Sequence, residues 1–239
     1  MPGTFVQEVA SNGTGGTSTT VTATAIGSTT EGNLLVAAAV SSDYTANAAT
    51  LADSKGNTWT KPVESHRTPN GPQLSVFWAV IAPGQAHSGG VDTFTATWAT
   101  SMSGRTICVA EFDNLTLTPF DQSASATGAS GSPTSAATST TSQADEMLIG
   151  AFGASYGIGA AHPFTAGPGY TIASARTTVR IAEAMIEYQN VSSTGAYSAS
   201  ASLDLAADGW VAAILTFEAA AGGVAPPGRH LLSATGAGL

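Results

Sequence analysis

The sequence predicts an all-β protein: two tandem antiparallel β-sandwiches, Ig-like or jelly-roll in topology, followed by an extended C-terminal arm. Three observations support this prediction. Apolar and hydroxyl-bearing residues alternate over many short stretches, turn-forming residues separate the stretches, and the pattern of the first half returns in the second. Alternation with a period of two is typical of strands that bury one face.

The internal repeat sets the domain organisation. It opens with Phe5-Val6-Gln7 and again with Phe120-Asp121-Gln122, and it includes two apolar runs that begin at Asn33 and Glu146. A period of about a hundred residues is a whole domain, so we expect each copy to bury its own core. The predicted units are a first repeat over 1–118, a second over 119–219 and a Gly/Pro-rich arm over 220–239.

The strands follow from alternation and from turn signals such as Asn12-Gly13, Pro83-Gly84 and Pro168-Gly169. Seven or eight short strands per copy with regular turns indicate a sandwich or a barrel, and their order stays open. In the first copy we expect strands near 4–10, 19–27, 33–42, 57–66, 73–82, 92–99 and 105–114. In the second copy we expect them near 119–126, 134–141, 146–154, 169–177, 180–191, 196–203 and 209–218.

The candidate core consists of the large apolar residues on the inward phase of these strands. Truncating one of them to Ala is expected to cost ~2 to 5 kcal/mol. They are Phe5, Val21, Leu35, Trp59, Phe77, Val80, Phe94, Trp98, Val109 and Phe112, and then Phe120, Leu148, Phe152, Tyr170, Met185, Ile186, Leu203, Trp210, Ile214 and Phe217.

Composition narrows the classes of partner. Charged residues are only 10% of the chain, and 7 Lys and Arg against 16 Asp and Glu give a formal net charge of −9. A negative chain repels the phosphate backbone, so we expect no nucleic acid partner. The N-terminus has no signal peptide pattern and no apolar run approaches ~20 residues, so neither export by a signal nor a membrane span is expected.

The cysteine content excludes a disulfide-stapled scaffold, because Cys108 is the only cysteine. Its neighbours Ile107 and Val109 place it in an apolar strand. We therefore expect Cys108 to be a small buried side chain and not a reactive thiol.

No catalytic group or cofactor site emerges from the sequence. The histidines His66, His87, His162 and His230 lack the spacing of a metal site and are interpreted as ordinary surface residues. Carboxylates at strand ends leave structural Ca²⁺ open as an alternative, although no EF-hand spacing is present. Glu183 and Glu187 share one strand face and are the candidates for a glycosidase pair, but the first copy has no acidic counterparts.

Two sets of residues are candidates for binding. Trp78 points to the opposite face from Phe77 and, together with Tyr44 and Tyr188, is a candidate platform for glycan stacking. The C-terminal arm ends in a small apolar group, and docking of such an extended arm is the alternative to a disordered tail. Its candidate partner-binding residues are Arg229, His230, Leu231 and Leu232.

The recurring frame resembles β-sandwich repeats of tailed-bacteriophage virion proteins and related bacterial surface proteins. The frame is a Phe-x-Gln opening, a Thr-rich strand, an apolar strand after Asn33 or Glu146, a Gly-x-Thr-Trp or Gly-Tyr-Thr turn, and a closing strand that ends in Phe. The resemblance covers 4–218 and rests on structural positions, so no functional residue is carried over. It implies a protein that decorates capsids, builds tail fibres or forms adhesive knobs.

The expected function is therefore that of a non-enzymatic virion structural protein, either a capsid decoration or a minor head or tail component. It would bind neighbouring capsid or tail subunits, form a homo-oligomer with a trimer as one form, and reach the virion from the host cytoplasm. The alternative is a carbohydrate-binding adhesin module that engages cell-surface glycans. A glycosidase or depolymerase ranks last, and no cofactor is expected.

Overall fold

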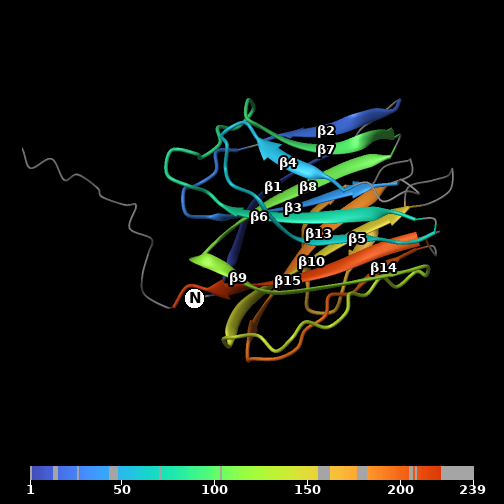
Figure 1. Cartoon of the computed structure of the whole chain (residues 1–239). Helices are drawn as coiled ribbons and strands as arrows, with labels where there is room; N and C mark the ends of the chain where they lie inside the picture. The colour runs from blue at the N-terminus through green and yellow to red at the C-terminus, as the bar shows by residue number, and fades with distance from the viewer. Residues whose placement is uncertain are drawn as a thin grey trace, which may run out of the picture.

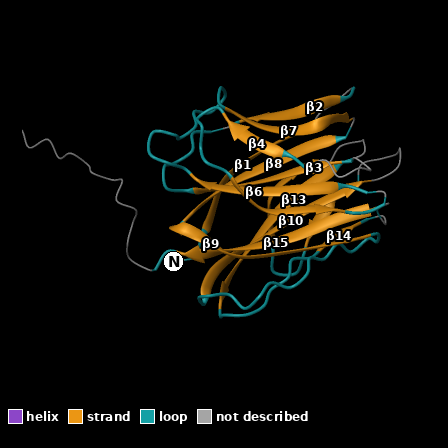
Figure 2. Cartoon of the chain, in the orientation of Figure 1, coloured by secondary structure: helices purple, strands orange, loops and turns teal. Residues whose placement is uncertain are grey.

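The computed structural model describes residues 2–12, 16–25, 27–42, 48–69, 71–102, 104–155, 162–176, 182–204, 207 and 209–221. Every helix or strand assigned in these ranges is a β-strand, and every pair of neighbouring strands is antiparallel (Figure 2). The prediction of an all-β antiparallel protein is confirmed at this level.

Two five-stranded sheets form the centre of the molecule (Figure 1). Inner sheet 1 has the order β1-β8-β3-β6-β5, and inner sheet 2 has the order β9-β15-β10-β13-β12. Inner sheet 1 contains β1 (Thr4–Asn12), β3 (Leu34–Ser41), β5 (Thr60–His66), β6 (Gln73–Val80) and β8 (Arg105–Asp113). Inner sheet 2 contains β9 (Leu115–Gly128), β10 (Asp145–Ser155), β12 (Thr171–Arg176), β13 (Glu183–Ser192) and β15 (Gly209–Ala219).

A smaller layer covers the outside of each inner sheet. Outer sheet 1 has the order β2-β7-β4, with β2 (Ser18–Thr24), β7 (Thr93–Met102) and β4 (Thr50–Asp53). Outer sheet 2 pairs β11 (Phe164–Ala166) with β14 (Ala201–Leu203). The segment 133–141 lies beside 195–200, where the backbone N–H groups of Ser135, Thr138 and Thr141 donate to the carbonyls of Ala199, Tyr197 and Gly195.

Three apolar cores separate the four layers. Outer core 1 lies between outer sheet 1 and inner sheet 1, and outer core 2 lies between inner sheet 2 and its covering layer. The third, the central core, is built from both inner sheets and therefore from both halves of the chain. The prediction of one core for each half omitted this shared core.

The central strands of the inner sheets, such as β3, β8, β10 and β15, are buried on both faces because alternate residues enter different cores. In β3, Val36 and Ala38 enter the central core, whereas Leu35 and Ala37 enter outer core 1. Every residue of β3 is buried. Strands buried in this way have near-continuous apolar sequences instead of alternation.

Most of the predicted core residues are buried. Five of them are only partly buried, because they lie at the margins of a core or keep a polar tip near the surface: Phe5, Trp59, Val80, Phe120 and Tyr170. Trp59 Nε1 donates a hydrogen bond to Asp53 Oδ2 at 2.7 Å. The Tyr170 hydroxyl donates to the carbonyl of Ser198 at 3.2 Å.

The strand predictions hold for the longer elements. The short strands β4 and β11 were not predicted, and the strand expected over 134–141 makes only one isolated bridge, between Thr134 and Ser200. The boundary predicted between residues 118 and 119 falls inside β9. Of the predicted arm over 220–239, only residues 220 and 221 belong to the described part of the chain.

Candidate functional site

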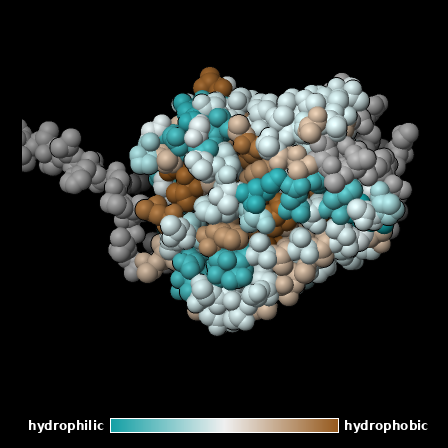
Figure 3. Space-filling view, in the orientation of Figure 1, coloured by the Kyte–Doolittle hydropathy of each residue, from teal (hydrophilic) through white to brown (hydrophobic). Residues whose placement is uncertain are grey.

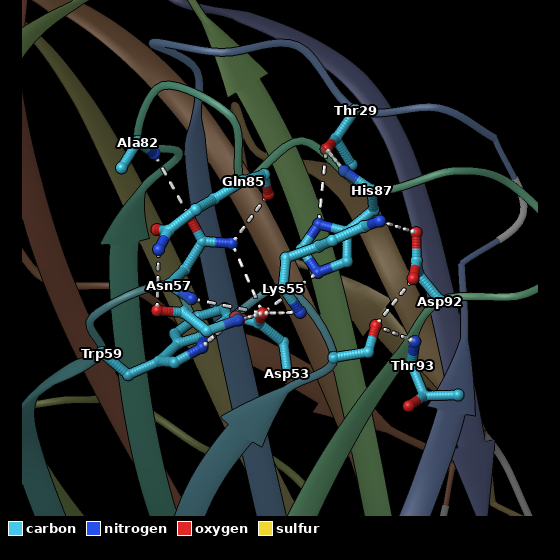
Figure 4. A network of polar contacts seen from close by, with 12 residues as sticks. Thr29, Asp53, Lys55, Asn57, Trp59, Ala82, Gln85, His87, Asp92 and Thr93 are labelled. Carbon is cyan, nitrogen blue, oxygen red and sulfur yellow. Dashed lines mark hydrogen bonds and ion pairs between the residues drawn. The ribbon is translucent and has the colours of Figure 1, made fainter.

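The densest polar network in the described residues closes one end of outer core 1 (Figure 4). It joins three connections that are far apart in sequence: β2 to β3 through Thr29, β4 to β5 through residues 54–59, and β6 to β7 through residues 82–92. Asp53, at the end of β4, lies at its centre.

The Asp53 carboxylate accepts hydrogen bonds from a tight turn and from an indole. Its Oδ1 accepts the backbone N–H groups of Lys55 and Gly56 at 2.8 Å each and that of Asn57 at 3.3 Å, while Oδ2 accepts Nε1 of Trp59. Burial alone would raise the pKa of Asp53. The contacts with His87, Trp59 and the turn outweigh this effect and lower its pKa to about 2. Asp53 is therefore a buried anion whose charge the turn requires.

His87 connects this carboxylate to Thr29. Its Nε2 lies 3.4 Å from Asp53 Oδ1, without hydrogen-bond geometry, and its Nδ1 lies 3.4 Å from Thr29 Oγ1. The order hydroxyl, imidazole, carboxylate is that of a nucleophilic triad. However, the His87 ring is 1% exposed and packs at 4.5 Å from the Phe94 ring.

The Thr29 hydroxyl is also already in use. Thr29 Oγ1 accepts the backbone N–H of His87 at 2.8 Å, and the N–H of Thr29 donates to the carbonyl of His87 at 3.0 Å. The cavity beside Thr29, lined also by Phe94 and Glu111, has a volume of about 20 Å³. This is about the space of one water molecule. The paired contacts between Thr29 and His87 hold two connections together.

A second carboxylate extends the network. Asp92 accepts the N–H of Ser88 at 2.5 Å and the hydroxyl of Ser54 at 2.9 Å, and its Oδ2 lies 3.2 Å from Lys55 Nζ. The hydrogen bond from Ser88, followed by those from Ser54 and Lys55, lowers the pKa of Asp92. These contacts fix the turn that leads into β7.

The network was not predicted from the sequence, and His87 was interpreted as a surface residue. That interpretation is wrong, because the ring is enclosed between Asp53 and Phe94. The sequence held no clear signal for the network, because the inward position of Asp53 next to Phe94 belongs to the short strand β4, which the sequence pattern does not reveal.

The second half buries carboxyl groups of a different kind. Glu183 and Glu187 share one face of β13, as predicted, and are 2% and 0% exposed. Each has one oxygen that accepts a backbone N–H, from His162 and Gly167 respectively, and one oxygen without a hydrogen-bond partner. Burial raises the pKa of each to about 7. Such groups are mainly neutral in the folded chain below pH 7.

Neither glutamate faces a cleft that the structure describes. Glu187 packs against Gly150 and Ala199, where an added Cβ at Gly150 would meet the Glu187 side chain at 2.8 Å. Burial, followed by the nearby charge of Glu187, raises the pKa of Tyr170. Glu183 lies near His162 and Asp204, which are themselves in contact at 2.8 Å. The glycosidase pairing of Glu183 with Glu187 stays an untested alternative.

Each half buries a further acid on its inner sheet, but at a different position of the repeat. In the first half, Glu111 accepts hydrogen bonds from Gln7 Nε2, the N–H of Thr30 and Asn33 Nδ2 at 2.6, 2.9 and 2.8 Å. In the second half the buried acid is Glu146, and the equivalent residue of the first half is Asn33. Burial, with Asp121 nearby, raises the pKa of Glu146 to about 7, and neither of its oxygens makes a regular hydrogen bond.

The two described candidates for glycan stacking pack against other aromatic rings. Trp78 stacks on Phe120 with a centroid distance of 5.9 Å, and Tyr188 stacks on Phe5 at 5.9 Å. Both are half-buried at the margin of the central core. Tyr44 lies outside the described residues. Glycan binding by these three residues stays a prediction.

Two predictions remain, one for Cys108 and one for the C-terminal arm. Cys108 is buried, as predicted, and its thiol donates to the carbonyl of Ala184 at 3.6 Å. The candidate arm residues Arg229, His230, Leu231 and Leu232 lie outside the described residues. Across the described ranges, no group of three or more His, Cys, Asp or Glu could hold a metal ion, and no helix is long and apolar enough to span a membrane.

Comparison of the chain with protein-family models, with curated proteins and with solved structures gave no match.

Proposed function

We propose that the chain is an internal duplication of one β-sandwich, with repeats over 1–118 and 119–219 and a C-terminal arm over 220–239. The equal strand orders of the two inner sheets support this proposal. β-bulges also recur at equivalent places. One lies between Phe5 and Gln7 opposite β8, and its counterpart lies in the pairing of β9 with Leu215 and Phe217. Bulges are features that related folds retain, so their recurrence favours common descent of the halves.

We further propose that the protein is a non-enzymatic virion structural component, a capsid decoration or a minor head or tail protein. The observation that carries the non-enzymatic part is the enclosed His87. The arrangement most similar to a catalytic triad connects two loops through Thr29, and its imidazole is 1% exposed.

The outer surface supports a role in subunit contacts. Along β2 and β7 most of the outward side chains are threonines, with Thr22 Oγ1 and Thr95 Oγ1 2.9 Å apart and no charged side chain between them. Figure 3 shows a broad pale surface of weak polarity, with smaller hydrophilic and hydrophobic areas. Covering such a face with a neighbouring subunit costs less solvation energy than covering a face of charged side chains would. Contacts of ~800 Å² per partner would suffice for specific binding.

The test is detection of the chain in purified phage particles. We expect it to co-sediment with assembled particles in fixed stoichiometry, and chains lacking 220–239 to occupy fewer sites. A double variant, Leu231→Ala with Leu232→Ala, separates the arm's apolar contacts from its length. A chain that stays in the soluble fraction of a phage lysate would contradict the virion role, and undiminished occupancy after the deletion would contradict docking of the arm.

A further inference from the structure

The two inner sheets meet as two copies of one sheet would meet in a symmetric dimer. β1 lies against β12 and β5 lies against β9, so each edge strand faces the counterpart of the opposite edge. This arrangement is a pseudo-twofold axis that runs along the strands and passes between the central strands β3 and β10. Figure 1 shows that the two sheets are stacked with their strands running along the same direction.

Aromatic rings across the central core follow the same symmetry. The Tyr188 ring of the second half packs against Phe5 and Phe112 of the first half, with ring centroids 5.9 and 5.7 Å apart. The Trp78 ring of the first half packs against Phe120 and Phe217 of the second half, with ring centroids 5.9 and 6.3 Å apart.

Trp78 and Tyr188 hold equivalent places in their sheets. Trp78 pairs with Val36 and Thr60, and Tyr188 pairs with Ile149 and Thr171. Reciprocal contacts of this kind define an isologous interface, in which each partner offers the same patch.

A residue that lies close to such an axis contacts the equivalent residue of the other half. Val40 of β3 pairs with Leu74 and Thr106, and Gly153 of β10 pairs with Ala184 and Val211, which are the corresponding positions of the second half. The two residues touch across the central core. A Cβ added to Gly153 would lie 2.9 Å from both Cγ atoms of Val40, closer than real Cβ contacts allow.

We propose that Val40 and Gly153 form a knob and a hole that direct the first half to pair with the second half and not with its own kind. The proposal rests on the duplication proposed above. A second copy of the first half would place Val against Val at this contact, and overpacking of that kind is destabilising. Two second halves would place Gly against Gly and leave a cavity. The inner face of the first half therefore pairs with the inner face of a second half, which the same chain supplies.

The contact with Val40 explains why position 153, within the long inner strand β10, is a glycine. Glycine weakens a strand interior and marks the close approach of another group. Here that group is the Val40 side chain. Since the inner faces are occupied within the chain, contacts with other subunits must use the outer layers, the sheet edges or the arm.

A double-mutant cycle in the full chain tests the proposal. Gly153→Val adds a second knob, and we expect the unfolding equilibrium constant to rise about tenfold or more. Val40→Gly opens a hole and should also destabilise. In the double variant the knob and the hole change sides, so we expect its stability to recover to within about fivefold of the natural chain, far from the sum of the single effects. Urea unfolding of the purified chain provides the measurement.

The control places the compensating hole elsewhere in the central core. Val76→Gly combined with Gly153→Val should not recover stability. If Gly153→Val does not fold, Gly153→Ala with Val40→Ala takes its place, because the added Cβ alone makes the close contact. A double variant as unstable as the sum of its single variants would overturn the knob and hole. That result would leave the duplication, which rests on strand order and bulges, and the particle test unaffected.

Discussion

Asp53 and Glu187 are two buried carboxyl groups that the fold holds in opposite charge states. Asp53 is surrounded by N–H donors, which lower its pKa to about 2. Glu187 receives a single N–H from Gly167 and lies otherwise among apolar neighbours, and burial raises its pKa to about 7. The number of donors that reach a buried acid therefore decides whether it folds charged or neutral.

Replacing Asp53 with Asn tests the charged case. The amide cannot accept all four hydrogen bonds as an anion does, so we expect a loss of about 2 kcal/mol in the free energy of unfolding at pH 7. Because the pKa of Asp53 is lower in the folded chain than its model value of 3.8, the stabilisation by its charge is present above pH 3.8 and disappears as the pH falls towards 2. Urea unfolding at several pH values measures both effects.

The exposed Asp145 provides the control for Asp53. Asp145→Asn should change the stability by less than about 0.5 kcal/mol at pH 7. A loss in Asp53→Asn that stayed constant between pH 7 and pH 2 would show that the Asp53 charge has no part in holding the turn.

Replacing Glu187 with Gln tests the neutral case. A carboxyl whose pKa rises from 4.5 to about 7 on folding destabilises the protein as the pH rises from about 4.5 to 7, and the loss approaches roughly 3 kcal/mol. Glutamine carries no proton to lose, so we expect Glu187→Gln to be more stable than the natural chain at pH 8 and similar to it at pH 5. Thermal unfolding at both pH values is the measurement. The exposed variant Glu64→Gln is the control, and equal behaviour of the two variants would contradict the prediction.

Among the elements, alternating strands were predictable and stacked sheets were not. β2 and β7 alternate threonine with apolar residues because one face is exposed, and this pattern reveals the strand directly. β3 and β10 have continuous apolar runs, which indicate a strand buried on both faces. Sequence analysis used these runs to place strands but did not infer that the inner sheets cover each other.

The missed elements have a common physical cause. β4 and β11 have four and three residues, too short for a period of two to stand out from chance. The network around His87 depends on three connections that meet only in the folded chain. Trp78 was placed on the face opposite Phe77, as the structure has it, but the opposing sheet that supplies Phe120 could not be read from local spacing.

At the scale of the whole molecule, the central core couples the two halves. Side chains of both inner sheets fill it, and fully buried residues of each half, such as Val36 and Phe217, belong to it. If one half unfolded alone, the other would expose its inner sheet to water, at a cost of ~25 cal/mol for each Å² of apolar surface. The halves should therefore unfold together.

We accordingly predict a single thermal transition, with equal calorimetric and van't Hoff enthalpies. Phe94→Ala in outer core 1 and Phe217→Ala in the central core should each destabilise by about 3 to 5 kcal/mol and move the whole transition to lower temperature. Differential scanning calorimetry of the three proteins provides the measurement. Independent halves would give two transitions, of which Phe94→Ala would move only one, because Phe94 belongs to outer core 1, which only residues of the first half build.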